Sequence, residues 1–105
     1  MDVLSIKEIH RLYSECTAVI TAHTKQRCRE RGISTQEVED AILSGEIIEQ
    51  YPDDYPFPSC LILGHAEGNP LHVVVGLGGG RIWIITAYRP DCERWSTDYR
   101  ERKEK

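Results

Sequence analysis

The chain has 105 residues and a mass of 12.0 kDa, and 40% of its residues are hydrophobic and 29% charged. This length accommodates one domain with one core, and this composition is typical of a folded globular domain. The longest uncharged run, Gly68 to Gly80, is too short for a membrane-spanning helix, and the N-terminus carries charge where a signal peptide is apolar. We therefore expect one soluble, cytoplasmic domain over residues 1–105 with no membrane partner.

The charges are segregated along the chain. The net charge of −4 argues against a nucleic-acid partner, because phosphate binding usually leaves a basic footprint. However, residues 23–31 hold four Lys or Arg against one acid, and residues 32–60 hold seven acids and no Lys or Arg. Residues 81–105 hold seven Lys or Arg against five acids. Such a domain can present one face to an anion and another to a basic partner.

The cysteines and histidines lack the spacing of a metal site. The four cysteines are far apart in the sequence, at Cys16, Cys28, Cys60 and Cys92. The four histidines show neither H-x-x-x-H nor H-E-x-x-H spacing. We predict reduced, unlinked and partly buried thiols, and neither a metal nor a cofactor.

Two helices are predicted at the start of the chain. Ser5 is a suitable N-cap for a helix that ends near Glu15, in which apolar residues recur at helical spacing. A second helix is expected to begin around Val19 or Thr21 and to run to Arg31, where a glycine follows as the terminator.

A third helix has the clearest local signals. Ser34 and Glu37 have the spacing of a capping box, and Gly45 follows as a terminator. The apolar residues between them fall on one face, at Val38, Ala41, Ile42 and Leu43.

After this helix the pattern becomes extended. A proline-rich loop over residues 52–58, a turn at Gly68-Asn69-Pro70 and a tight hairpin at Gly78-Gly79-Gly80 separate the apolar runs. The two central runs are apolar on both faces, which implies cover on both sides of the sheet, or on one side plus a partner. Four strands are therefore predicted, over residues 46–51, 59–65, 71–77 and 81–88.

Together these elements predict an α+β fold in which N-terminal helices pack on a four-stranded antiparallel sheet. The single domain divides into an N-terminal helix (1–18), a helix-helix-four-strand core (19–99) and a charged tail (100–105) that we expect to fray.

A first candidate site lies on the second predicted helix. His23, Arg27 and Arg31 are spaced four residues apart and therefore stack along one helix face. Arginine forks suit phosphate or carboxylate, and a histidine can move a proton near neutral pH. An equally plausible interpretation is a solvated face whose arginines pair with the acids of residues 37–54.

A second candidate site lies at the end of the last strand. Strict alternation places Ile82, Ile84, Thr86 and Tyr88 on one face, so two hydroxyl groups emerge where the apolar strand ends. If the glycines make the whole hairpin turn, His72 lies near Thr86 or Tyr88. Threonine and tyrosine are also good strand formers, and a hydrogen-bonded core histidine is a fair alternative.

Other chemistries are not supported. The glycines of residues 76–80 are followed by Arg81 and a strand, whereas a phosphate loop requires Lys-Ser/Thr and a helix. No G-x-S-x-G motif, paired carboxylates on facing strands or Cys-His nucleophile arrangement stands out.

Several short motifs occur in a specific order between about His23 and Lys103. They are His23-x-x-x-Arg27, Arg31-Gly32-Ile33-Ser34, Gly45-Glu46-Ile47-Ile48-Glu49-x-Tyr51, Leu71-His72-Val73-Val74, Ile84 to Asp91 and Trp95. In this order they resemble the domain-of-unknown-function 4258 family. The resemblance implies the fold of small bacterial toxin ribonucleases, RelE-like or of the barnase and colicin type, without a metal and often beside an antitoxin.

By the same resemblance, the family's helix histidine and arginine correspond to His23 and Arg27, and its last-strand threonine and tyrosine to Thr86 and Tyr88. We therefore expect a metal-independent endoribonuclease of the toxin-antitoxin type, acting by 2′-hydroxyl attack on free or ribosome-bound RNA. The expected catalytic residues are His23, Arg27 and Tyr88, and the expected substrate-binding residues are Arg31, Thr86, Arg89 and His72.

The alternative is a non-catalytic protein- or RNA-binding module of the same fold. It would hold a protein partner on the apolar sheet face and on the acidic strip over residues 37–54. The sequence does not distinguish between oligomeric states.

Overall fold

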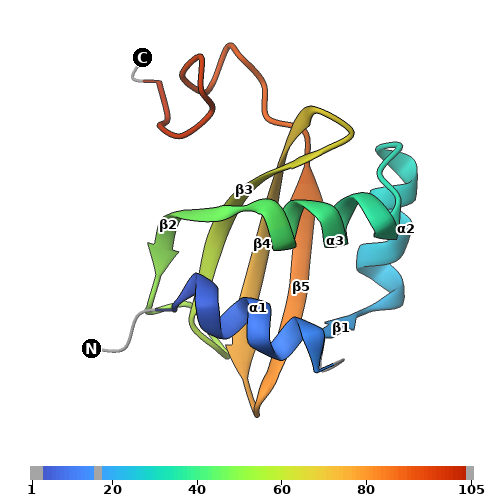
Figure 1. Ribbon diagram of the computed structural model, residues 1–105, viewed down its shortest axis with the longest axis vertical. Helices are drawn as coiled ribbons and strands as arrows, with labels where there is room; N and C mark the ends of the chain where they lie inside the picture. Colours follow the sequence, from blue (N-terminus) through green and yellow to red (C-terminus); the bar gives the residue numbers. More distant parts are fainter. Residues whose placement is uncertain (1–3, 16–17, 104–105) are drawn as a thin grey trace.

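The computed structural model describes residues 4–15 and 18–103, which form an α+β fold of three helices and five strands (Figure 1). The helices are α1 (Ile6–Ser14), α2 (Ala22–Glu30) and α3 (Thr35–Ser44). The strands are β1 (Ala18–Ile20), β2 (Glu46–Tyr51), β3 (Ser59–Ala66), β4 (Asn69–Gly78) and β5 (Arg81–Tyr88).

The sheet is mixed, with the strand order β1-β5-β4-β3-β2. The four predicted strands pair antiparallel, but the prediction of a four-stranded antiparallel sheet is wrong at one edge, where β1 pairs parallel to β5. Val19 lies opposite Trp83 in this pair, so the second helix does not begin there. It begins at Ala22, and the Thr21 side chain accepts a hydrogen bond from the Thr24 amide as the N-cap.

The predicted capping box at the start of α3 is present. The Ser34 hydroxyl accepts a hydrogen bond from the Glu37 amide at 3.0 Å, and the Glu37 carboxylate accepts one from the Ser34 amide at 2.9 Å. Ser5, predicted to cap α1, occupies the N-cap position, but its side chain makes no capping hydrogen bond.

This difference between the two caps predicts different mutational effects. Ser34→Ala should lower the free energy of unfolding by about 1 kcal/mol, because it leaves the Glu37 amide without its partner. Ser5→Ala should change the free energy of unfolding by less than about 0.5 kcal/mol. Urea denaturation of both variants measures the difference, and equal losses would contradict the assignment of the caps.

Of the two predicted hairpin turns, one lies at the predicted glycines and the other lies earlier in the chain. Gly79 and Gly80 form the predicted turn between β4 and β5, with φ angles of +63° and +73° that L-residues rarely adopt. The turn predicted at Gly68-Asn69-Pro70 instead occupies Glu67 and Gly68, because β4 already begins at Asn69. Both turn residues have positive φ, at 55° and 82°.

One face of the sheet carries the main core. α1 and α3 cross this face (Figure 1), and α3 packs so closely on β3 at Ala41 that only a glycine, Gly64, fits beneath it. A hydrogen bond of 2.8 Å from His10 Nε2 to the Ile42 carbonyl joins α1 to α3. The buried residues of this core include Ile9, Leu12, Val38, Ala41, Ile42, Cys60, Ile62, Leu71, Val73, Val75, Ile82, Ile84 and Ala87.

α2 lies along the open edge of β5. β1 pairs with β5 only as far as Ile84, so the following carbonyl groups of β5 need other donors. The Thr24 hydroxyl donates to the Ile85 carbonyl at 3.2 Å, and Arg31 Nη1 donates to the Ala87 carbonyl at 2.8 Å. α2 therefore completes the edge that β1 leaves unpaired.

A β-bulge in β5 interrupts the strict alternation of faces that was predicted for this strand. The register shifts between the pairs Val74–Thr86 and Val75–Ile84, which leaves Ile85 as the extra residue. Because of this shift, Thr86 and Tyr88 lie on the face opposite Ile84, not on the same face as predicted. The bulge also brings Tyr88 opposite His72 in the register. In a hairpin without the bulge, Ala87 would pair with His72.

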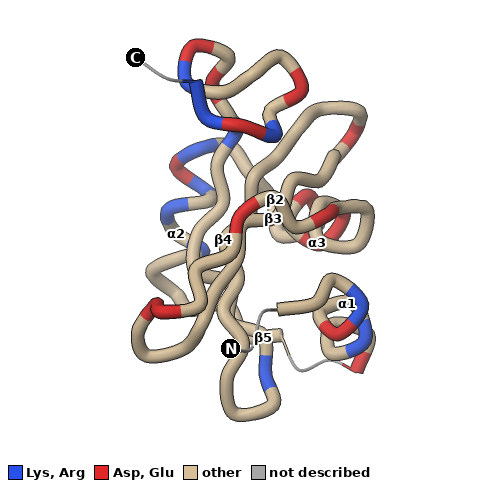
Figure 2. Tube along the Cα trace, turned by 90° about the vertical axis from the view of Figure 1, so that its left-hand side faces the viewer, with Lys and Arg blue, Asp and Glu red and all other residues tan. Residues whose placement is uncertain are grey.

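Residues 89–103, here called the C-terminal segment, loop beyond the end of β5 at one end of the sheet (Figures 1 and 2) and reach the side chains of β2. Arg102 forms an ion pair with Glu49, and Arg100 forms one with Glu46. The tail predicted to fray is thus anchored as far as the structure describes it, to Lys103, because β2 supplies carboxylates to its arginines. The contacts of Trp95 and Tyr99 with His72 place the C-terminal segment on the sheet face opposite α1 and α3.

Among the described residues, Cys28 and Cys60 are buried free thiols and Cys92 is an exposed one, while Cys16 lies outside the described ranges. None of the described helices is both long and apolar enough to span a membrane.

Candidate functional site

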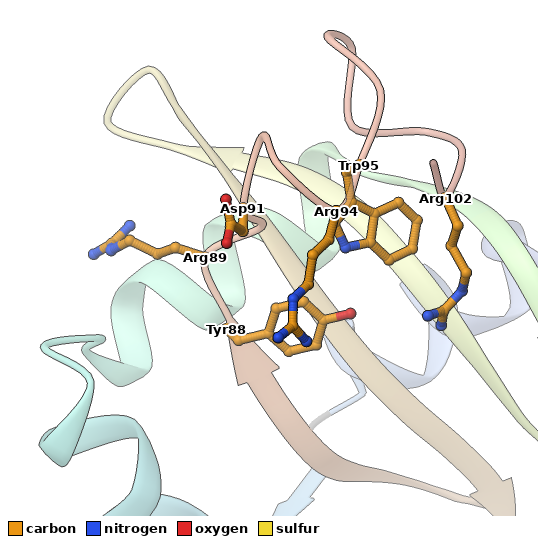
Figure 3. Close-up of a pocket in the computed structure, with 6 residues that line it drawn as sticks. All are labelled: Tyr88, Arg89, Asp91, Arg94, Trp95 and Arg102. Atoms are coloured by element: carbon orange, nitrogen blue, oxygen red, sulfur yellow. The ribbon is translucent and has the colours of Figure 1, made fainter. Parts of the chain in front are cut away.

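A pocket of about 420 Å³ lies where β5 passes into the C-terminal segment (Figure 3). Its walls combine aromatic rings with arginine side chains, a pairing suited to an anionic ligand with an aromatic part. The lining residues are Tyr88, Arg89, Asp91, Arg94, Trp95 and Arg102.

Tyr88 is joined to a fully buried histidine. His72 is 0% exposed, its Nδ1 lies 3.2 Å from the Tyr88 hydroxyl, and its Nε2 lies 2.9 Å from the Tyr99 carbonyl oxygen. The carbonyl can only accept, so Nε2 carries the proton. Burial lowers the pKa of His72, against the opposing effects of the Tyr99 carbonyl and Glu49. In the neutral ring, Nδ1 therefore accepts a hydrogen bond from the Tyr88 hydroxyl.

The Tyr88 hydroxyl is the polar group that connects His72 to the pocket. Burial raises the pKa of Tyr88, so the phenol stays protonated near neutral pH. Within the described ranges no other hydrogen bond engages its oxygen, so the lone pairs of that oxygen are available to a ligand. In Figure 3 the hydroxyl points toward the side of the pocket on which Arg102 lies.

The lowered pKa of His72 predicts a pH dependence of stability. Between the ordinary pKa of histidine, about 6.5, and the lower pKa of the folded state, the unfolded chain binds a proton that the folded chain does not. The free energy of unfolding should therefore fall as the pH drops below about 6.5, by at most about 1.4 kcal/mol per pH unit. Glu49 should not contribute between pH 7.5 and 5, because its pKa is lowered and the ordinary pKa of glutamate already lies below this range.

Urea denaturation at several pH values between 7.5 and 5 measures this slope. His72→Gln should flatten it, whereas His65→Gln, which replaces an exposed histidine, should leave it unchanged. A slope that persists in His72→Gln would show that another group causes it.

The three arginines of the pocket differ in their partners. Arg89 donates to Glu37 at 2.9 Å and to the Gly32 carbonyl at 3.3 Å, and it points away from Tyr88 in Figure 3. Arg94 has no side-chain hydrogen bond or ion pair with any residue in the described ranges. Its positive charge is therefore available to an anion.

Arg102 is held between a carboxylate and an aromatic ring. Its Nε and Nη2 donate to the two oxygens of Glu49 at 2.9 and 3.1 Å, and its guanidinium lies 4.8 Å from the centroid of the Trp95 ring. Tyr51 donates a further short hydrogen bond to Glu49. Burial and this carboxylate raise the pKa of Tyr51 to about 12, so it remains a donor.

Trp95 links this network to the histidine. It is buried, and its ring meets the His72 ring edge-on with centroids 4.4 Å apart. The chain of contacts from Glu49 through Arg102, Trp95 and His72 ends at Tyr88. One cluster thus joins β2, β4, β5 and the C-terminal segment.

The residues predicted from the sequence fall into two groups. His72 and Tyr88 are in contact, and Arg31 Nη1 donates to the Thr86 hydroxyl at 3.1 Å. Thr86 precedes Tyr88 by two residues on the same sheet face, so Arg31 lies roughly 7 Å along the strand from Tyr88.

The other group is formed by His23 and Arg27, which are exposed on α2. No hydrogen bond or ion pair in the described part of the chain joins either of them to Tyr88 or His72. Figure 2 shows Lys and Arg along α2 and again in the C-terminal segment. The catalytic roles of His23 and Arg27 remain predictions.

Sequence reasoning named Arg89 but missed the other residues that the C-terminal segment contributes. Arg94, Trp95 and Arg102 line the pocket, and Glu49 holds Arg102 from β2. The available signal was Trp95, a large aromatic residue in an otherwise charged stretch, which is typical of a packed segment.

A second, apolar cavity of about 350 Å³ lies on the same sheet face, toward the hairpin between β4 and β5. Its walls include Phe57 and Trp83, whose rings stack with centroids 5.8 Å apart, and Tyr55, which is 95% exposed. Asp54 lies at its rim. Among the described side chains, no three His, Cys, Asp or Glu residues come together to hold a metal ion.

A family model described as domain of unknown function (DUF4258) matches residues 20–89 of the chain. No curated protein and no solved structure matches the chain.

Proposed function

Since the chain belongs to the DUF4258 family, whose description states no activity, we propose its function from the pocket: it binds single-stranded RNA there and cleaves it. The observation that carries the proposal is the hydrogen bond between Tyr88 and His72 in the wall of an arginine-lined pocket. The RelE-like fold expected from the sequence is part of the same proposal.

The first step is phosphate binding. Arg94 has no carboxylate partner among the described residues, and Arg102 keeps N–H groups that Glu49 does not occupy. Guanidinium groups bind phosphate oxygens through charge-assisted hydrogen bonds. Arg31, held beside Thr86, adds positive charge along β5 for a neighbouring phosphate.

The second step is 2′-hydroxyl attack. The 2′-oxygen forms a bond to phosphorus, its proton passes to the Tyr88 oxygen, and the proton of Tyr88 passes to Nδ1 of His72. The bond from phosphorus to the 5′-oxygen breaks, and that oxygen takes a proton from water. Arg94 and Arg102 stabilise the charge that develops on the phosphate oxygens. The products are a 2′,3′-cyclic phosphate and a 5′-hydroxyl group.

In this proposal the proton is moved by the pair of Tyr88 and His72. His23 and Arg27 then bind a part of the RNA that lies along α2. In the alternative predicted from the sequence, His23 itself serves as the base. His23→Ala distinguishes these two roles, because only the second requires loss of the cleavage step.

Phosphate binding is tested by Arg94→Gln. We expect RNA affinity to fall by roughly tenfold, because one charged hydrogen-bond donor to the phosphate is lost. Arg81→Gln, at the opposite end of β5, is the matched control and should bind RNA like the wild type. Fluorescence anisotropy with a labelled, 2′-O-methylated single-stranded oligoribonucleotide, which stays intact, measures both variants, and equal affinities would contradict the assignment of the pocket.

A second candidate function is a non-catalytic module that holds a protein partner, such as an antitoxin. The specific observation in its favour is the apolar cavity with the exposed Tyr55 and the half-exposed Ile85. If this function is correct, Tyr55→Ser combined with Ile85→Ser should abolish co-purification with the product of a neighbouring gene and leave RNA uncleaved by wild type and variant alike.

A further inference from the structure

Glu49 takes no part in the proton transfer proposed above, yet it accepts three hydrogen bonds from residues beside the pocket. It lies on β2, on the sheet face that also carries Tyr51, and accepts two hydrogen bonds from Arg102 and one from Tyr51. Its hydrogen bonds to both residues lower its pKa despite the opposing effect of burial, so it is ionised at neutral pH.

The guanidinium of Arg102 is fixed from two directions. Glu49 engages Nε and Nη2 in a bidentate pair, and the Trp95 ring lies against the guanidinium at 4.8 Å. A guanidinium has five N–H groups, of which Glu49 engages two and Tyr51 contacts a further one, so others stay open to a ligand. The Arg102 side chain is 62% exposed, which leaves these groups accessible to a ligand.

We propose that Glu49 is a positioning residue, which fixes the guanidinium of Arg102 so that its free N–H groups bind the RNA phosphate. This role rests on the proposed function, since it explains how one phosphate-binding residue of that site is held in place. A planar fork loses little conformational freedom on binding when a carboxylate and an aromatic ring already hold it.

A positioning role and a purely electrostatic role of Glu49 predict opposite changes in RNA affinity. Removing the carboxylate of Glu49 raises the net positive charge of the pocket, so a purely electrostatic role predicts tighter RNA binding in Glu49→Gln. A positioning role predicts weaker binding, because glutamine offers one acceptor in place of two and its amide group opposes an Arg102 donor. The sign of the change therefore distinguishes positioning from charge.

Glu46 provides a matched control. It lies on the same strand and forms an ion pair with Arg100 of the same C-terminal segment. Glu46→Gln therefore removes one carboxylate and one anchor of the segment without touching Arg102. Urea denaturation of both variants shows whether they lose similar stability.

The experiment measures the affinity of wild type, Glu49→Gln and Glu46→Gln for a single-stranded 2′-O-methylated hexauridylate, which lacks the nucleophile and stays intact. We expect roughly tenfold weaker binding for Glu49→Gln and less than a twofold change for Glu46→Gln. In the ¹H–¹⁵N spectrum, the Arg102 Nε–H signal should be protected from exchange in wild type and Glu46→Gln and lost in Glu49→Gln.

Unchanged or tighter binding in Glu49→Gln would overturn the positioning role and leave the proposed function standing. Equal weakening in both variants would also overturn it, because Glu49 would then only anchor the segment. If the wild type itself does not bind the RNA, both the positioning role and the proposed function fail.

Discussion

Tyr88→Phe should reduce the rate of RNA cleavage by roughly 10²- to 10⁴-fold, the usual contribution of a positioned proton-transfer group. The variant keeps the aromatic ring, which meets the His72 ring edge-on with centroids 5.2 Å apart, and loses only the hydroxyl that joins His72 to the pocket. RNA affinity should change little, because the arginines remain. Cleavage of a fluorescently labelled oligoribonucleotide under single-turnover conditions measures the chemical step.

The control for this prediction is Tyr55→Phe, which removes the hydroxyl of a tyrosine that is 95% exposed and lies outside the pocket, and which should cleave RNA like the wild type. His23→Ala provides the competing hypothesis. If His23→Ala abolishes cleavage while Tyr88→Phe retains it, the base lies on α2 and the pair of Tyr88 and His72 has a structural role.

The largest expected effect on stability comes from Gly64→Ala. A methyl group at this position would lie 1.9 Å from the carbonyl oxygen of Ala41, which is backbone of α3 and cannot rotate away. The helix would have to move off the sheet at the centre of the core, so we expect a loss of about 3 kcal/mol or more.

Gly76→Ala is the matched control for Gly64→Ala. Its methyl group would meet the Ile85 side chain at 3.4 Å, an ordinary contact, and should change the free energy of unfolding by less than about 1 kcal/mol. Urea denaturation followed by tryptophan fluorescence compares the two variants. An unfolding midpoint of Gly64→Ala equal to that of the wild type would contradict the packing of α3 on β3.

The parts of the fold that depend on local signals were predictable. The capping box of Ser34 and Glu37 requires only neighbours in the sequence, and the turn at Gly79 and Gly80 requires only residues that tolerate positive φ. β1 was not predictable in the same way. Its three residues form a strand because they pair with β5, more than sixty positions away, and no local pattern indicates that pairing.

The same distinction applies to the candidate site. The position of the hairpin placed His72 near Thr86 or Tyr88, and the structure shows the contact with Tyr88. The bulge at Ile85, which brings Tyr88 directly opposite His72, has no signal in the sequence of β5. The contribution of the C-terminal segment depends on ion pairs between Arg102 and Glu49 and between Arg100 and Glu46. Pairs separated by some fifty residues leave no mark in a single sequence.

The proposed RNA specificity follows from the use of the 2′-hydroxyl as nucleophile. A DNA strand of the same sequence lacks this group, so it should bind to the arginines and remain intact. The proton transfers proposed above use only side chains of the chain, so cleavage should persist when a chelator is present.

The most direct test of the proposed cleavage is to incubate the purified protein with a single-stranded oligoribonucleotide in the presence of a chelator and to identify the ends of the products by mass spectrometry. We expect fragments that end in a 2′,3′-cyclic phosphate with the wild type, and an intact strand with Tyr88→Phe or with a 2′-O-methylated substrate. An intact strand with the wild type, or equal cleavage by Tyr88→Phe, would contradict it.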